Sequence, residues 1–402
     1  MTATDDLVTG YLELGLRFDR LVDGFVDAYT GDPAVGQRVA DEPMPTADDL
    51  LDQARNLLFA LPDAGLPADR EEFVRAHLAA LEQNAARLAG REMTLVEEVA
   101  AYFQVDIALV DTDVYAQAHQ DIAELLGGSG PVGERLSAVR GAEACPPELV
   151  EPAVRALAAA LRDRVVPAAG LEPGEHIDFE IERDVAWSGF NYYLGDYTSR
   201  VAVNADVAHR MSQLPVLVAH ECYPGHHTEH CRKEDLLVRR GGQLEQTIFL
   251  VNTPQCVMAE GLGDLALSAA IGEGWGAWAA DVLAGIGPSF DPMLVEALEI
   301  AARPLNTVRQ NAAIMLHDGG VDEAEVADYL VRWSLVDPAR AKQQLRFMTD
   351  PLWRAYGSTY VEGERLLRPW LEAREGGVTA FERFRRLLDE PLTPAVIRAE
   401  LV

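Results

Sequence analysis

One segment of this sequence departs from the pattern of all the rest. Residues 176–204 alternate apolar and polar positions in HIDFEIERD and then gather aromatic residues and glycine in WSGFNYYLGDYTSRVAVN. This is typical of two or three short strands, with turns near Ser188-Gly189 and Leu194-Gly195. Most of the remaining chain repeats its apolar residues at helical spacing. The sequence therefore predicts a mainly α fold with one small β-sheet.

Helical signals are clear in the first part of the chain. Thr46 with Asp49, and Thr94 with Glu97, have the spacing of capping boxes at the start of helical patterns. One apolar stripe is spaced four, three, four and three residues apart: Val74, Leu78, Leu81, Ala85 and Leu88. The run GGSGPVG then interrupts the pattern at residues 127–133. We expect an N-terminal helical layer over residues 1–130 and a catalytic core over residues 131–402, which together form either two domains or one continuous domain.

The charge of the chain restricts its partners. Its 402 residues include 65 acidic and 34 basic side chains, for a net charge of −31, which argues against nucleic acid and anionic membranes. The acidic N-terminal segment MTATDDLVTGY is unlike a signal peptide. The four cysteines are too few and too scattered for a disulfide framework. We expect a soluble, cytoplasmic protein. The sequence does not determine its oligomeric state.

Four of the nine histidines lie within eleven residues, in LPVLVAHECYPGHHTEH at residues 214–230. Many zinc hydrolases place two histidines at i and i+4 of a helix, with a glutamate after the first as general base. Here Glu221 follows His220, but the next histidine is His226, about 120° away on a regular helix. Pro224 and Gly225 favour a bulge or kink at 223–225 that brings His226 back beside His220.

Two further choices concern the remaining ligands. His227 lies on the same face as His220 without a kink, but the rise of about 10.5 Å over seven residues strains the reach to one ion, so we favour His226. Downstream, Glu260 and Asp264 lie at i and i+4. Glu260 is positioned to bind the metal while Asp264 orients a ligating imidazole. Two histidines and one glutamate suit Zn²⁺ well.

These motifs resemble those of a bacterial family called domain of unknown function 885, which is similar to the gluzincin metallopeptidases. HECYPGHH and the later AEGLGDLA match its pattern, and SRVAVN and MTDPLWRAYGSTYVEGERLL resemble its flanking segments, over roughly residues 180–370. The resemblance implies metal ligands His220, His226 and Glu260, with Glu221 as the catalytic carboxylate. It also implies a largely helical gluzincin-like fold, in which we place the small sheet beside the active-site cleft. The chain departs from the family at Glu229 and at 262–264, which affects the substrate pocket.

Other residues are weaker candidates. Arg200 has a planar guanidinium that suits a substrate carboxylate, although an ordinary ion pair is an equal alternative. Tyr356 and Tyr360 share a predicted helix, and Tyr360 is our candidate for stabilising an oxyanion. His209 and His317 receive no role. A closed structural zinc site could be formed from Cys222, Cys231, His227 and His230. However, the spacing of these residues matches no zinc-finger pattern.

The sequence thus predicts a zinc-dependent hydrolase, a metallopeptidase or amidase acting on a peptide or small amide. The metal polarises the scissile carbonyl, and Glu221 takes a proton from water and passes it to the leaving amine. Two alternatives remain. One is a metal-dependent enzyme acting on a non-peptide small molecule, and the other is a non-enzymatic metal-binding protein with a closed four-ligand site.

Overall fold

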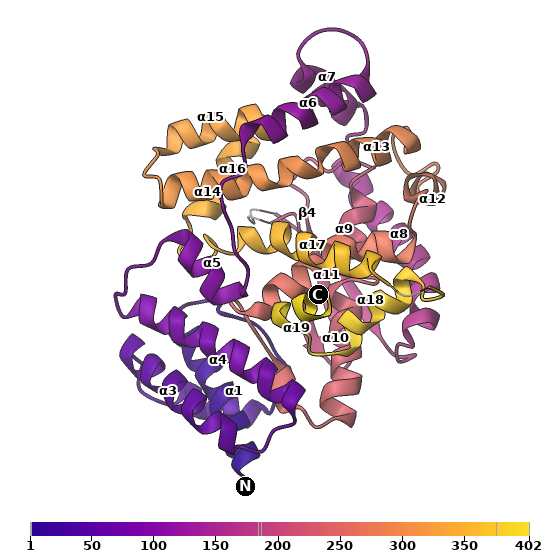
Figure 1. The fold of residues 1–402 in the computed structure, drawn as a ribbon. Helices are drawn as coiled ribbons and strands as arrows, with labels where there is room; N and C mark the ends of the chain where they lie inside the picture. The colour runs from indigo at the N-terminus through magenta and orange to yellow at the C-terminus, as the bar shows by residue number, and fades with distance from the viewer. Residues whose placement is uncertain (1, 184, 186, 375, 402) are drawn as a thin grey trace.

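Helices make up most of the computed structural model, which describes residues 2–183, 185, 187–374 and 376–401 (Figure 1). The prediction of a mainly α fold with a small sheet is confirmed. The first four helices are α1 (Ala3–Leu21), α2 (Pro33–Ala40), α3 (Ala47–Ala60) and α4 (Ala68–Leu88). Of these, α1, α3 and α4 pack side by side at one end of the molecule (Figure 1).

The predicted helix starts in this layer are confirmed. The Thr46 side chain accepts a hydrogen bond from the Asp49 N–H, and the Asp49 carboxylate accepts one from the Thr46 N–H. Thr94 and Glu97 make the same pair at the start of α5. In α4 the apolar stripe is buried except for Leu88 at the helix end. Burying this stripe against α1 and α3 holds the layer together.

A two-stranded sheet ties this layer to the middle of the chain. Strand β1 (Val26–Tyr29) pairs antiparallel with β5 (Ile248–Leu250). Ile248 and Leu250 join the hydrophobic cluster formed by α1, α3 and α4. The sequence analysis missed this sheet, because strands of four and three residues are too short to show alternation. The pairing fixes the N-terminal layer against the segment that leads into α11.

Three strands are present in the segment where two or three were predicted, and they form one sheet. They are β2 (His176–Glu182), β3 (Gly189–Gly195) and β4 (Thr198–Asn204). The central strand, β4, pairs parallel with β2 and antiparallel with β3. The inner face of β4 is apolar and buried, with Val201 and Val203 in the main core. Residues 187–189, at the start of β3, border the cleft described below.

The helix α11 (Pro254–Ala270) lies at the centre of the molecule, with nearly all of its residues buried (Figure 1). It packs closely along α17 (Gly357–Glu372). The two helices can approach because Gly261 and Gly363 face each other; a Cβ atom on Gly261 would lie only 2.5 Å from the Gly363 carbonyl carbon. The helix α9 (Leu214–Glu221) also packs on α11. These three helices therefore meet at one place in the core.

The other helices surround this centre. Those before the three-stranded sheet are α5 (Leu95–Phe103), α6 (Thr112–Leu126), α7 (Val132–Ala142) and α8 (Pro147–Ala169). Those after it are α10 (His226–Lys233), a π-helix at Glu234–Arg240, α12 (Trp275–Val282), α13 (Pro292–Ala302), α14 (Thr307–His317), α15 (Glu323–Ser334), α16 (Pro338–Thr349), α18 (Ala380–Asp389) and α19 (Pro394–Glu400). Short 3-10 helices lie at Leu61–Asp63, Leu244–Thr247 and Arg303–Asn306. Within the described part of the chain, no helix combines the length and the apolar character needed to cross a bilayer.

Candidate metal centre

The histidine segment folds as two helices separated by residues 222–225. The first, α9, ends at Glu221 and the second, α10, begins at His226, with a cis bond between Tyr223 and Pro224. The Gly225 N–H donates to the Ala219 carbonyl at 2.9 Å, and a Cβ atom on Gly225 would lie only 1.8 Å from the His220 carbonyl oxygen. Only glycine fits this approach. The sequence predicts a bulge or kink here; the structure has a complete break.

This break places the His226 ring beside the His220 ring, with 4.6 Å between the centroids and an angle of 89° between the planes. Glu260 of α11 completes the group. Its Oε2 atom lies 3.1 Å from His220 Nε2, and one ligand atom from each of the three residues lies within 4.8 Å of the others. No second group of this kind occurs in the described part of the chain.

Each of the three residues has a partner outside the group. Asp264 Oδ1 lies 3.2 Å from His220 Nδ1, and a carboxylate oxygen of Glu229 lies 3.8 Å from His226 Nδ1. The Tyr356 hydroxyl donates to Glu260 Oε1 at 2.5 Å. Such outer partners fix the orientation of ligating side chains. They leave the Nε2 atoms and Glu260 Oε2 as the atoms available to an ion.

The residues present fit a zinc ion. Glu260 Oε2 is buried, and although it lies 3.1 Å from His220 Nε2, it makes no hydrogen bond of regular geometry to any described residue. Two imidazoles and one carboxylate form a common ligand set of catalytic zinc, with an open position left for water. Burial lowers the pKa of His220, but its bonds to Asp264 and Glu260 outweigh burial and raise the pKa well above its usual value. The two carboxylates therefore favour positive charge at this place, which a divalent cation supplies.

Glu221 stands beside this group, at the end of α9. Its side chain is buried and lines the cleft. Burial raises the pKa of Glu221, and the nearby His220 and His226 act in the opposite direction without cancelling the effect. The Asn191 side-chain amide of β3 donates to the Glu221 carbonyl at 2.7 Å, so the three-stranded sheet anchors this helix end. A carboxylate with a raised pKa suits a proton acceptor near neutral pH.

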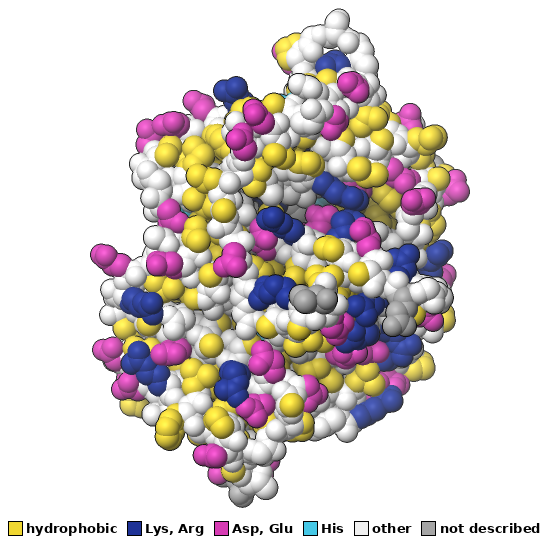
Figure 2. Space-filling view, viewed as in Figure 1, with side chains coloured by type: hydrophobic (Ala, Val, Ile, Leu, Met, Phe, Trp, Pro, Cys, Tyr) yellow, Lys and Arg dark blue, Asp and Glu magenta, His cyan; other side chains and the backbone are white. Residues whose placement is uncertain are grey.

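A cleft opens in front of Glu221 and His220, with a cavity volume of about 300 Å³. It is lined by α9, α14, α16, α17 and residues 187–189. Figure 2 shows a hollow on this face of the molecule, between the positions of α14 and α17 in Figure 1. A volume of this size is at the lower end of the range for small-molecule sites.

Tyr360 of α17 lines the cleft next to His220, with 6.4 Å between the ring centroids. Burial, followed by the charges of Glu260 and Glu221, raises the pKa of Tyr360 well above its usual value. Its hydroxyl therefore keeps its proton and remains a hydrogen-bond donor at neutral pH. Tyr356, one turn earlier, faces Glu260 instead. The structure thus brings Tyr360 to the predicted metal ligands.

His227, the competing ligand, lies elsewhere. It is fully buried, and its two ring nitrogens contact the Ser199 hydroxyl and a Glu175 carboxylate oxygen, each at 2.8 Å. Cys231 packs against the same ring, with Sγ 3.6 Å from Nε2. Burial, the largest influence, lowers the pKa of His227. These contacts make His227 a link between α10 and the three-stranded sheet.

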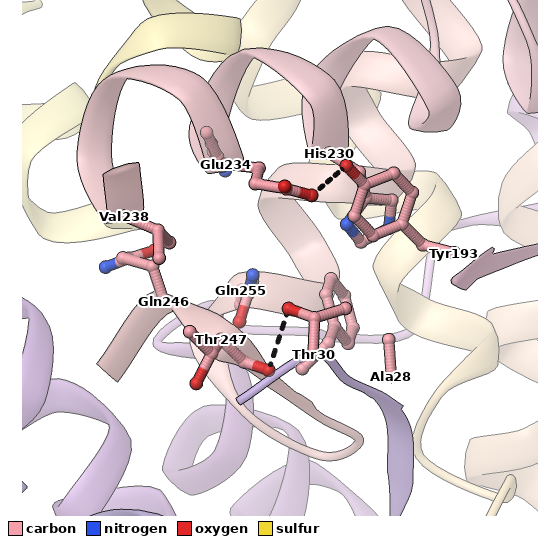
Figure 3. Close-up of a pocket in the computed structure, with 11 residues that line it drawn as sticks. Ala28, Thr30, Tyr193, His230, Glu234, Val238, Gln246, Thr247 and Gln255 are labelled. Carbon is pink, nitrogen blue, oxygen red and sulfur yellow. Dashed lines mark hydrogen bonds between the residues drawn. The ribbon is translucent and has the colours of Figure 1, made fainter. Parts of the chain in front are cut away.

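The fourth histidine of the segment, His230, lines a separate small cavity (Figure 3). Its ring stacks on Tyr193 with 4.6 Å between centroids, and the Tyr193 hydroxyl donates to Glu234 at 2.5 Å. The cavity volume is about 20 Å³, room for about one water molecule. The structure brings neither this histidine nor the four free cysteines into a ligand group in the described chain.

The structure places Arg200 on the three-stranded sheet, away from the ligand group. Its guanidinium lies 3.2 Å from the Glu180 carboxylate of the neighbouring strand and over the Tyr192 ring, 4.3 Å from the centroid. This is the ordinary ion pair that the sequence analysis weighed as the alternative. The cationic side chains of the cleft come from α14, α16 and the residues before α17 instead: Arg309, Arg340 and Arg354.

Asp27 of β1 lies close enough to the site to interact with its charges, and it was not predicted from the sequence. The pairing of β1 with β5 shifts register between Val26 and Ala28, so Asp27 is the extra residue of a bulge, a device that redirects a side chain. Burial raises the pKa of Asp27 to about 7, with smaller effects from His226, Glu260 and Glu221. No sequence motif marks this aspartate, because only the long-range strand pairing brings it to the site.

Gly263 provides a test of how closely the ligands are held. A Cβ atom at this position would lie 2.6 Å from His220 Cε1 and Nδ1. We expect Gly263→Ala to push the imidazole away from Asp264 and to weaken zinc binding by about 10- to 100-fold, as outer-sphere changes do. Competition with a chromogenic chelator measures the affinity. Gly141→Ala, in open space on α7, is the matched control, and unchanged affinity in Gly263→Ala would contradict the geometry.

Comparisons with known proteins add information on the fold. No sequence model of a known family and no curated protein matches this chain. A solved structure of a putative lipoprotein from Colwellia psychrerythraea is similar, with 14% identity and a TM-score of 0.54 over 89% of this chain and 70% of that one. A putative lipoprotein of unknown function from Shewanella oneidensis shows 15% identity and a TM-score of 0.51 over 92% and 75% of the two chains.

At this level of identity the likeness shows the fold alone, but it corrects one expectation. The predicted cytoplasmic location is wrong, because both of these structures are described as lipoproteins, and lipoproteins are held at a membrane by covalently attached lipid. The lack of a spanning helix among the described residues does not decide the location, because attachment through lipid needs no such helix.

Proposed function

We propose that the protein is a zinc-dependent hydrolase that cleaves amide bonds, as a metallopeptidase or amidase. The observation that carries this proposal is the meeting of His220, His226 and Glu260 beside Glu221, at the inner end of an open cleft. Three protein ligands facing a cleft are typical of catalytic zinc, whereas structural zinc has four ligands and is closed. This supports an enzyme over a non-enzymatic metal-binding protein.

The side chains take the following roles in the proposed reaction. When bound, zinc supplies Lewis-acid chemistry and lowers the pKa of water. Glu221 accepts the proton of the attacking water and passes it to the departing amine. Tyr360 donates its hydroxyl hydrogen to the oxygen on which negative charge develops. Asp264 and Tyr356 hold His220 and Glu260 in place.

The finer classification is part of the same proposal. The helix break at PGHH and the glutamate on a following helix support the resemblance to the family called domain of unknown function 885 and a gluzincin-like fold. The three-stranded sheet borders the cleft through residues 187–189, in agreement with the place expected for it. The fold alone does not set the reaction, because one fold supports many chemistries.

The proposal is tested with the full chain. Elemental analysis of the purified protein is expected to give about one zinc per chain. A mixed peptide library, screened beside small amides and esters, is expected to show peptide cleavage that 1,10-phenanthroline stops and added zinc restores. Zinc-loaded protein that leaves every peptide, amide and ester intact would show the proposal to be wrong.

A second candidate is a metal-dependent hydrolase of a non-peptide small molecule. The modest cavity volume, about 300 Å³, favours it, since this suits a ligand of small-molecule size. The same screen separates the two candidates. Cleavage confined to the esters would select this second function.

A further inference from the structure

The cleft in front of the metal centre carries a charge opposite to that of the protein. The chain has a net charge of −31, yet the described residues that line the cleft away from its metal end include no carboxylate. The acidic lining residues are Glu221 and Asp264, which lie beside His220, and the other charged lining residues are arginines. In Figure 2 dark-blue Lys and Arg side chains border the hollow, with magenta Asp and Glu side chains among them. The lining therefore offers positive charge to a substrate in the cleft.

Two of the lining arginines have no ion-pair partner among the described residues. Arg354 is neutralised by the buried carboxylate of Glu98. In contrast, Arg309 of α14 contacts the face of the Tyr360 ring, 5.9 Å from its centroid, and Arg340 of α16 donates to the neutral Gln343 at 2.6 Å. Asp337, the nearest acidic residue on α16, accepts from the Arg340 backbone N–H as the helix cap.

Many partly buried arginines of this molecule pair with carboxylates, as Arg70 does with Glu245 at 2.6 Å, while others, such as Arg140, bond to neutral groups. Arg309 and Arg340 differ from these because they line the cleft. Burial lowers the pKa of Arg340, and the charge of Arg309 lowers it further. The charge of Asp337 opposes this effect without cancelling it. Two partly buried like charges without an ion-pair partner among the described residues are destabilising. An anion bound between them would relieve this cost.

The arginines also lie at a defined distance from the reacting centre. The guanidinium carbon of Arg309 is 5.9 Å from the Tyr360 ring, and that ring is 6.4 Å from the His220 ring. The guanidinium and His220 are therefore separated by about 12 Å at most. An extended peptide advances about 3.3–3.6 Å per residue. The anion would lie within about three or four residues of the bond that is cut.

Neighbouring groups suit the backbone of a peptide in the same cleft. Gln310 and Gln344 line it, and the side-chain carbonyl oxygen of each is buried without a hydrogen-bond partner among the described residues. Buried acceptors of this kind are costly unless a donor reaches them. Amide N–H groups of a bound peptide would supply such donors.

We propose that Arg309 and Arg340 bind a carboxylate of the substrate, and that the protein cleaves peptides near a free C-terminus. This rests on the hydrolase function proposed above. A carboxylate accepts two parallel hydrogen bonds from one guanidinium. The same chemistry could come from an acidic side chain of the substrate, so the experiment has an arm for each source.

Binding is measured first, so that the result does not depend on turnover. The zinc-loaded Glu221→Gln variant is titrated with three probes: tetra-alanine with a free carboxylate, tetra-alanine amide, and the amide of Ala-Glu-Ala-Ala. Trp187, in the cleft lining, provides a fluorescence signal, with calorimetry as a second readout. We expect the free acid to bind about 10- to 100-fold more tightly than its amide, the size of a hydrogen bond to a charged group.

Arginine variants are then made in the same background. Arg309→Gln and Arg340→Gln are each expected to remove most of the preference for the acid, whereas Arg→Lys at either position keeps the charge and part of the preference. Arg346→Gln, at an exposed position on the same helix as Arg340, is the matched control and should keep the full preference for the free acid. If the Ala-Glu-Ala-Ala amide binds as tightly as the free acid, the arginines bind a carboxylate, but its source is an acidic side chain.

Two failures are distinguishable. Equal binding of acid and amide, unaffected by Arg309→Gln and Arg340→Gln, would overturn the carboxylate site even if the enzyme cleaves peptides. An arginine-dependent preference for the acid in a protein that cleaves no peptide, amide or ester would keep the carboxylate site and remove the hydrolase function. Turnover of the three probes by the wild-type protein completes the comparison.

Discussion

Replacing Glu221 by glutamine is expected to lower turnover by about 10²- to 10⁴-fold, the contribution of a positioned general base, while zinc stays bound. Glutamine keeps the shape of the side chain but has no lone pair basic enough to take a proton from water. The ligand atoms belong to His220, His226 and Glu260, so the metal content should not change. Steady-state kinetics on a peptide found in the screen, together with elemental analysis, measure both quantities.

The control for this variant is Glu124→Gln, at an exposed position on α6. It makes the same chemical change far from the cleft and should behave as the wild type. Full activity in Glu221→Gln would rule out its role as proton acceptor. Loss of zinc together with activity would instead mean that Glu221 contributes to the metal group itself.

Replacing His220 by alanine is expected to abolish stoichiometric zinc binding. The change removes one of three ligands, and it also leaves Glu260 and Asp264 close together without the imidazole between them. The loss should exceed the roughly 10- to 100-fold that a change in an outer partner costs. Zinc content after dialysis and affinity by chelator competition provide the measurements.

A graded series makes the second test specific. Asp264→Asn removes only the partner of His220 Nδ1 and should fall between wild type and His220→Ala. His176→Ala, at an exposed histidine on β2, should bind zinc as the wild type does. Circular dichroism checks that each variant is folded. Retention of one tightly bound zinc in folded His220→Ala would mean that the metal lies elsewhere.

The local patterns in the sequence were sufficient for much of the fold. Capping boxes at Thr46 and Thr94 and the alternation in residues 176–204 act over a few residues, and the structure has the predicted helix starts and strands. The break at residues 222–225 follows from the properties of proline and glycine in a helix. Such features are predictable because neighbouring residues decide them.

The features that the sequence did not reveal depend on distant contacts. Strand β1 is visible only through its pairing with β5, and Asp27 reaches the site only through that pairing. Arg309 and Arg340 lie on two helices that no sequence motif marks, and only the packing of α14 and α16 brings both to the cleft. Arg200, the arginine proposed from the sequence, lies on the sheet instead.

The pairing of β1 with β5 has a consequence for biosynthesis. Val26 is synthesised early, but it cannot pair until Leu250 has been synthesised. Tyr356 and Tyr360 are synthesised still later. Contacts between such distant residues form slowly, because a long loop must close first. A growing polypeptide therefore lacks part of the proposed catalytic centre until residue 360 has been made.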